Sequence, residues 1–209
     1  MDSGKFEIIK NDLLGKSTSK RRKAAIVLRK ESLRGVCNFL VEGYKLETTE
    51  QWKTRVEIIK ALSYNGCMNG ISLLKSVIFD NTSDYSIIKK EAAKAWVRLT
   101  RKKLNDSDSI IQLLGIKDFV IVEAALEVLG YDKMIPDEVS QEIILKECWD
   151  FGFDRPEGVV DPRYGLAAAC AGWTSDIAKD FLSHCLKSDD VPLVYVAKKS
   201  LTGKYVKLR

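Results

Sequence analysis

The chain has 209 residues, of which 45% are hydrophobic and 30% charged, a composition that excludes a disordered protein and supplies apolar side chains for a continuous core. No apolar run approaches the roughly 20 residues that span a bilayer, and the first residues lack the basic-then-apolar layout of a signal peptide. We therefore expect a cytoplasmic protein with one domain over residues 1–209.

The formal net charge of +5 is unevenly distributed along the chain. Residues 1–34 carry 10 Lys/Arg against 4 acidic residues, and residues 87–104 carry 7 against 1. Residues 105–161 reverse the balance, with 14 acidic residues against 4 basic ones. This asymmetry predicts a dipolar molecule, and it bears on the choice of partner rather than on the fold.

The spacing of apolar residues predicts helices along the whole chain. These residues recur at intervals of three, four and seven, and no long stretch alternates with the period of two that marks a strand. We expect almost no strand. In chain order, the predicted helices cover residues 5–14, 17–30, 33–44, 52–64, 70–79, 85–104, 109–114, 118–129, 137–149, 164–173, 175–186 and 191–201.

A short pattern repeats in every second predicted helix: a small or apolar residue, then an apolar or small one four positions later. Successive copies are 34, 35, 32, 43 and 29 residues apart. A period in the thirties, in units too short to bury their own apolar faces, predicts stacked helix pairs. The first residues of the six copies are Ala24, Ile58, Ala93, Ala125, Ala168 and Ala197.

The spacing of 43 reflects an irregular insertion over residues 150–162, DFGFDRPEGVVDP, which reads as a loop because it holds two glycines and two prolines. Two interpretations stay open. The insertion is either a longer connection between paired helices or a binding loop that presents Phe151, Phe153 and Arg155.

Aligned on these copies, the second helix of each pair resembles those of the HEAT-repeat, armadillo-like family. That family's loose signature is an Asp-Pro start, an arginine in the first turn and alanine-rich later turns. The resemblance covers residues 17–205 and implies a right-handed α-solenoid of about six helix pairs, with the second helices lining a concave face. One departure is that basic residues fill the arginine position in the first three repeats, whereas aspartates fill the Asp-Pro position in the last three. The matching residues are Asp118, Asp161-Pro162 and Asp190 at the start, and Arg21, Arg55 and Lys90 at the arginine position.

A basic stripe follows the predicted second helices of the first three repeats. Within residues 90–102 a basic residue recurs every four positions, so these side chains lie on one side of their helix. If the second helices line a concave face, the N-terminal half presents a basic groove to an acidic protein surface or a phosphate backbone. The alternative is a solvated helix face. The stripe and its neighbours are Arg21, Arg22, Arg55, Lys90, Lys94, Arg98 and Lys102.

The sequence predicts no catalytic residues, no metal site and no cofactor. The only histidine, His184, follows Ser183 directly, so on a helix the two side chains point about 100° apart and do not form a catalytic dyad. No Cys-x-x-Cys pair exists, and the cysteine count is odd, which favours buried thiols in a reducing compartment over a disulfide framework. The cysteines are Cys37, Cys67, Cys148, Cys170 and Cys185.

We therefore expect a non-enzymatic protein-interaction module: an adaptor, an assembly chaperone, or an inhibitor of the immunity-protein type. The partner is a protein with an acidic surface, and neither a membrane nor a small-molecule substrate is inferred. The candidate aromatic anchors for such a partner are Trp52, Trp96, Tyr195 and the insertion phenylalanines Phe151 and Phe153. A third class, a purely oligomerising module, also stays open.

The alternative is nucleic-acid binding, because some DNA glycosylases for alkylated bases resemble HEAT repeats and use a Trp-Asp motif with arginines nearby. The only Trp-Asp here is Trp149-Asp150, with Arg155 and Arg163 following it, and the rest of the motif is missing. Carboxylates in the fourth repeat disfavour a long duplex along the groove.

Overall fold

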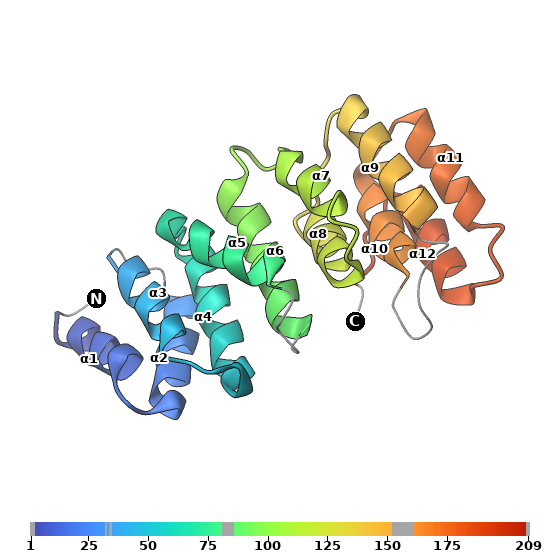
Figure 1. Cartoon of the computed structure of the whole chain (residues 1–209). Coiled ribbons are helices and arrows are strands. Elements are labelled where there is room, and N and C mark those ends of the chain that lie inside the picture. The colour runs from blue at the N-terminus through green and yellow to red at the C-terminus, as the bar shows by residue number, and fades with distance from the viewer. Residues whose placement is uncertain (1–2, 32, 34, 81–85, 152–160, 208–209) are drawn as a thin grey trace. The chain divides into compact units, whose positions relative to one another are not determined.

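The structure, a computed structural model, describes residues 3–31, 33, 35–80, 86–151 and 161–207, and all regular structure in those ranges is helical. Twelve α-helices and three short 3-10 turns follow one another along the chain (Figure 1). The prediction of an all-α fold is confirmed for this part of the chain. The α-helices are α1 (Ser3–Leu14), α2 (Thr18–Lys30), α3 (Cys37–Lys45), α4 (Trp52–Tyr64), α5 (Ile71–Phe79), α6 (Ser86–Thr100), α7 (Asp108–Leu114), α8 (Phe119–Tyr131), α9 (Glu138–Phe151), α10 (Pro162–Ala169), α11 (Asp176–Cys185) and α12 (Val191–Leu201).

Helices that are neighbours in sequence are also neighbours in space. Each odd-numbered helix packs against the even-numbered helix that follows it, so the described residues form six helix pairs. These pairs match the predicted helices within a few residues at most ends. Helix α6 ends at Thr100 rather than at the predicted residue 104, because the Asp106 carboxylate accepts a hydrogen bond from the Lys102 amide (2.9 Å) and holds the chain in a turn.

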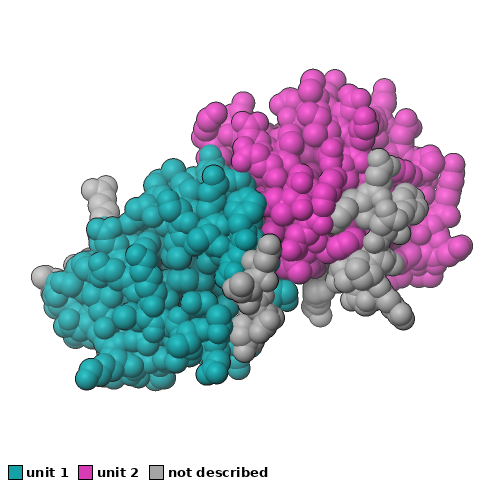
Figure 2. All heavy atoms as spheres, viewed as in Figure 1, with its two compact units in different colours: residues 1–100 teal, residues 101–209 magenta. Residues whose placement is uncertain are grey.

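The chain divides into two compact units, residues 1–100 and residues 101–209 (Figure 2). In unit 1, the even-numbered helices α2, α4 and α6 pack side by side, with α1, α3 and α5 against them. In unit 2, the even-numbered helices α8, α10 and α12 pack in the same order, with α7, α9 and α11 against them. Each unit is therefore a sequential array of helix pairs, and the single domain expected over residues 1–209 stays a prediction.

The core of each unit lies where the even-numbered helices meet, and small residues bring those helices close together. The first residues of all six sequence copies are at most 4% exposed. A close approach lies in unit 2, where a Cβ added to Gly165 of α10 would lie 2.9 Å from the Cβ of Leu126 on α8. The alanine-rich pattern thus serves helix packing, as a stacked array of pairs requires.

The aspartates at the start of the last three repeats are N-caps. Asp118 accepts hydrogen bonds from the amides of Val120 (2.9 Å) and Ile121 (3.2 Å), and Asp161 accepts one from the Arg163 amide (2.8 Å). Asp190 caps α12 in the same way. These bonds satisfy backbone donors that a helix leaves unpaired at its N-terminus, which explains the recurrence of aspartate there.

Within the described ranges, no helix combines the length and the apolar character that crossing a membrane requires.

Candidate functional site

Arg21 is buried, so its predicted exposure is wrong. Its side chain is 5% exposed, and its Nε donates a hydrogen bond to the equally buried carboxylate of Glu47. The guanidinium also donates to the Gly15 carbonyl and to the Thr18 hydroxyl (3.3 Å). Its neighbour Arg22 is exposed. Arg21 therefore joins α2 to the segment after α3, and only Arg22 is open to a partner.

Arg55 of α4 is half-buried and converges on the same segment. Its Nε donates to the Glu47 carbonyl (3.2 Å), and its guanidinium lies over the Tyr44 ring, 4.8 Å from the centroid. Burial raises the pKa of Tyr44, and the positive charge of Arg55 partly offsets the rise. Glu47 is thus the shared partner of two predicted site residues, although in the sequence it stood unmarked in the polar stretch LETTEQ.

One side of the even-numbered helices in unit 1 carries charges of both signs, and the side chains of Glu57, Glu91 and Lys94 there are 13%, 12% and 16% exposed. The Glu57 carboxylate on α4 contacts Arg29 of α2 (3.2 Å) and Lys60 (4.0 Å). On α6, Lys94 pairs with Glu91 at 2.6 Å. We call this surface the even-helix face; it comprises Arg22, Arg29, Glu57, Lys60, Glu91 and Lys94.

The even-helix face repeats with the period of the fold. The pair Glu91 and Lys94 follows Glu57 and Lys60 after 34 residues, so each of two adjacent helices presents a carboxylate and an ammonium one turn apart. The predicted basic stripe is therefore interrupted by acidic side chains. The count of 7 Lys/Arg against 1 acidic residue over residues 87–104 includes Glu91 but does not show that it shares a face with Lys94.

The remaining stripe residues differ in their surroundings. Lys90 and Arg98 are half-buried on α6, as expected for one face of that helix. Lys102 is exposed but lies in the turn after α6, because the helix ends at Thr100. The four-residue spacing consequently reflects a continuous helix face only as far as Arg98.

The predicted binding loop is not described. Phe153 and Arg155 lie outside the described residues, and Phe151 is the last residue of α9, with its side chain outside the description. The choice between a plain connection and a binding loop therefore stays a prediction.

An apolar groove separates α9 from α11 in unit 2 and encloses about 390 Å³. The Trp149 ring lies edge-to-face against Phe181 (centroids 5.7 Å apart) and His184 (5.1 Å). Ser183 instead donates its hydroxyl hydrogen to the Lys179 carbonyl (2.8 Å). The neighbours Ser183 and His184 thus point to different partners, as their helical spacing predicted.

Arg163, one of the arginines near the Trp-Asp pair, pairs with the residue that caps the start of its own helix. Its Nε donates to Oδ1 (3.1 Å) and Oδ2 (2.9 Å) of Asp161, and its Nη2 donates to Oδ2 (2.6 Å). Hydrogen bonding to this carboxylate raises the pKa of Arg163. Because Asp161 also caps α10, the arginine belongs to a cap network rather than to an open groove.

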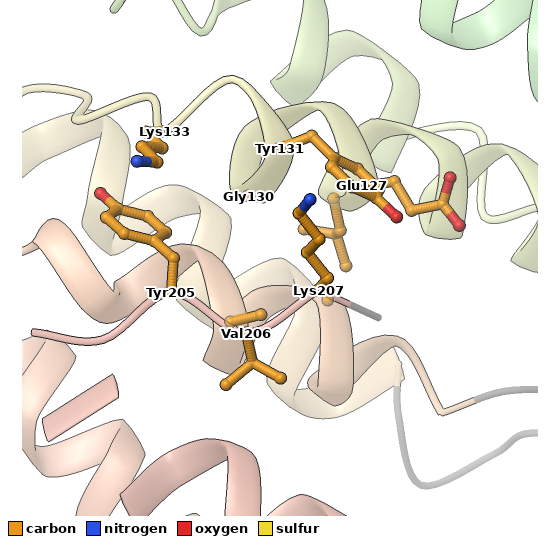
Figure 3. A pocket seen from close by; sticks show the side chains of 10 residues that line it. Glu127, Gly130, Tyr131, Lys133, Tyr205, Val206 and Lys207 are labelled. Atoms are coloured by element: carbon orange, nitrogen blue, oxygen red, sulfur yellow. The ribbon is translucent and has the colours of Figure 1, made fainter. Parts of the chain in front are cut away.

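A smaller cavity of about 190 Å³ lies in unit 2 between the C-terminal ends of α8 and α10 and the segment after α12 (Figure 3). Gly130 and Gly165 form part of its wall, and Glu127, Tyr131 and Lys207 lie at its edge. Glu127 is one of the fourth-repeat carboxylates that disfavour a long duplex, and residues 205–207 line the same cavity. The repeat ends at Leu201, so it predicts nothing for the residues that follow.

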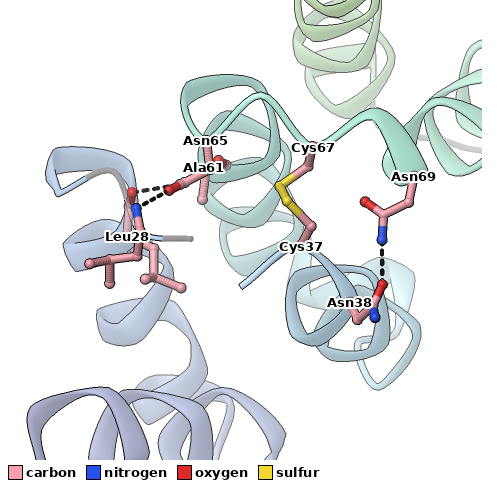
Figure 4. The surroundings of a disulfide bond; sticks show 8 residues. Leu28, Cys37, Asn38, Ala61, Asn65, Cys67 and Asn69 are labelled. Atoms are coloured by element: carbon pink, nitrogen blue, oxygen red, sulfur yellow. Dashed lines mark hydrogen bonds between the residues drawn. A yellow bond between two sulfur atoms is a disulfide. The ribbon is translucent and has the colours of Figure 1, made fainter. Parts of the chain in front are cut away.

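Cys37 and Cys67 form a disulfide, which corrects the prediction that all cysteines are reduced (Figure 4). They are 30 residues apart, close to one repeat, so stacking of the pairs brings them together. Beside the disulfide, the Asn65 side-chain amide donates to the carbonyls of Leu28 (2.8 Å) and Ala61 (2.9 Å). Disulfides persist in oxidising compartments, and the cytoplasmic location expected from the sequence stays a prediction.

The other three cysteines are buried thiols, as predicted. Burial raises the pKa of Cys148 and of Cys185 to about 12, and it also raises the pKa of Cys170. A thiol with so high a pKa is protonated near neutral pH and is a poor nucleophile or metal ligand.

Among the described side chains, no group of three or more His, Cys, Asp or Glu residues is arranged to hold a metal ion. In comparisons with known proteins, neither a family model nor a curated sequence matches the chain.

Proposed function

We propose that the chain is a HEAT-like α-solenoid that acts as a non-enzymatic protein-interaction module, in the manner of an adaptor, an assembly chaperone or an inhibitor of the immunity-protein type. The observation that carries the proposal is the even-helix face, where cations and carboxylates alternate across adjacent helices. Repeated helix pairs support the solenoid assignment, since stacked repeats of this kind present long, pre-formed binding surfaces.

The sign pattern of the even-helix face favours a protein partner over a nucleic acid. A phosphate backbone carries one sign of charge along its length, so it would meet Glu57 and Glu91 as well as the cations beside them. A folded protein surface matches alternating charges, and such complementarity contributes to specificity and to the association rate.

The overall charge of unit 1 indicates that the partner surface is acidic. Residues 1–100 carry 19 Lys/Arg and 11 Asp/Glu, a formal charge of +8, whereas residues 101–209 carry 15 and 18, a charge of −3. Arg22 is exposed at the start of the even-helix face, where no buried pair restrains it. The ion pairs on α4 and α6 hold their side chains in place before binding, which lowers the ordering cost of association.

The test is quantitative capture of partner proteins from cells that naturally produce the chain. Arg22→Glu should lose at least tenfold of the captured partner, while Lys75→Glu, with the same change of charge, should retain it. Lys75 is a matched control because it is an exposed basic residue of the same unit on an odd-numbered helix, α5. Equal loss in both variants would show that net charge, and not this face, drives capture.

Nucleic-acid binding is the second candidate, favoured by the charge of +8 on unit 1. A filter-binding titration with a short DNA duplex and with single-stranded RNA at two salt concentrations separates the two. Binding through phosphates loses affinity steeply as salt rises, in proportion to the number of contacts. Tight, salt-sensitive retention that Arg22→Glu removes would replace the protein-interaction proposal.

A further inference from the structure

The segment after α12 turns back onto its own unit. Gly203 has a positive φ of 71°, which an L-residue with a side chain adopts at a cost. Its amide donates to the Ser200 carbonyl (2.9 Å), and the Lys204 amide donates to the Lys199 carbonyl (3.0 Å). These bonds end the helix and reverse the chain, so that residues 203–207, here called the return segment, run beside α8 and α10 (Figure 3).

The return segment is held chiefly by one aromatic side chain. The Tyr205 hydroxyl lies against Gly172, where an added Cβ would be 2.1 Å from the hydroxyl oxygen and 3.2 Å from Ile135. The Lys133 ammonium lies 5.1 Å from the centre of the Tyr205 ring. Gly172 thus forms the floor of a socket that accepts this ring only because position 172 has no side chain.

The rest of the return segment is loosely attached. The backbone amides of Tyr205, Val206 and Lys207 form no hydrogen bond with any described residue. The cavity of about 190 Å³ remains between the segment and the helices beneath it. The segment therefore leaves part of the groove over α8 and α10 unfilled.

The charges of the helix and of the segment are complementary. Helix α8 carries Glu123 and Glu127 and no basic residue. The return segment carries Lys204 and Lys207, and Glu127 and Lys207 line the same cavity. A basic, aromatic segment therefore suits this surface better than an acidic one.

From these observations we infer that the groove over α8 and α10 is a peptide-binding site, and that the return segment occupies it as a built-in competitor. The ligand class is an extended partner segment with an aromatic residue followed by an aliphatic and a basic one, the order of Tyr205, Val206 and Lys207. This inference rests on the proposed interaction role and adds a second surface to it. A small organic ligand fits less well, because ligand cavities commonly enclose about 300–1,000 Å³.

The experiment adds the return segment in trans. The probe is a fluorescein-labelled peptide of residues 203–209, GKYVKLR, and the readout is fluorescence anisotropy with the full-length protein. Tyr205→Ala in the protein weakens the internal copy, so this variant should bind the peptide at least tenfold more tightly than wild type. A peptide with alanine in place of its tyrosine should not bind.

Matched variants separate loss of the socket from loss of the fold. In the Tyr205→Ala background, Gly172→Ala should abolish peptide binding because its methyl group fills the ring socket. The control Gly115→Ala should leave peptide binding unchanged, because only helix carbonyls lie near position 115, the closest at 3.5 Å. Circular dichroism should show the same helicity in all variants. Equal affinity in wild type and Tyr205→Ala, or no binding to a folded Tyr205→Ala protein, would overturn the inference. Because the probe comes from this chain, neither result depends on the partner of the even-helix face.

Discussion

Reduction of the Cys37–Cys67 disulfide should destabilise the protein by a calculable amount. The bond closes a loop with a sequence separation of 30 residues, and it joins the start of α3 to the turn before α5. Cross-linking restricts the unfolded chain, and for a loop of roughly 30 residues the loop-closure estimate is about 3.6 kcal/mol at 25 °C. Removing the bond therefore lowers the free energy of unfolding by up to about 3.6 kcal/mol.

The assay compares urea unfolding and thermal melting before and after reduction with dithiothreitol. If the whole chain unfolds as one unit, a loss of about 3.6 kcal/mol lowers Tm by roughly 7–14 °C, and by more if unit 1 unfolds alone. Cys37→Ala is the control, because a protein without the bond should show no response to the reductant.

Thiol counting provides the independent check. The unreduced protein, once unfolded, should expose the three thiols of Cys148, Cys170 and Cys185, and the reduced protein should expose all five cysteines. Five reactive thiols without reduction, or a Tm that reductant leaves unchanged, would refute the reasoning.

Three further predictions concern stability. Arg21→Ala leaves the buried Glu47 carboxylate unpaired and should lower the free energy of unfolding in urea by about 3–5 kcal/mol. The control Arg22→Ala removes an exposed side chain and should lower it by under about 0.5 kcal/mol. Similar losses in the two variants would contradict the burial of Arg21. Gly165→Ala should cost about 1–3 kcal/mol because its methyl group enters the α8–α10 contact, with Gly115→Ala as the near-neutral comparison in the same unfolding assay. Burial raises the Cys148 pKa to about 12 in the folded state from its ordinary value of 9.0, so above about pH 9 the unfolded state binds fewer protons and stability falls with rising pH. The urea midpoint of Cys148→Ala should therefore fall less between about pH 8 and pH 10.5 than that of the wild type.

Much of the fold was predictable because its determinants are local and periodic. The apolar spacing located the helices, and the recurring small residues such as Ala93 and Ala125 identified the positions where even-numbered helices touch. Asp118 and Asp190 occupy helix starts, as their place in the repeat suggested. Each of these features depends on residues within one or two turns.

The candidate site was less predictable because its determinants are contacts between distant residues. Nothing near Arg21 in the sequence indicates that Glu47, 26 residues later, neutralises it. The Cys37–Cys67 pair likewise depends on stacking of adjacent repeats. A count of charges along one helix also misses the carboxylates on its neighbour. Comparison of positions one period apart, as for Glu57 and Glu91, is the signal that finds the mixed-charge face.

The most direct test of the interaction role is hydrogen–deuterium exchange of the chain alone and in complex with its captured protein partner. The account predicts slower exchange in the complex at α2, α4 and α6, which carry the even-helix face, with α1, α3 and α5 unchanged. Protection confined to the odd-numbered helices of unit 1 would contradict it.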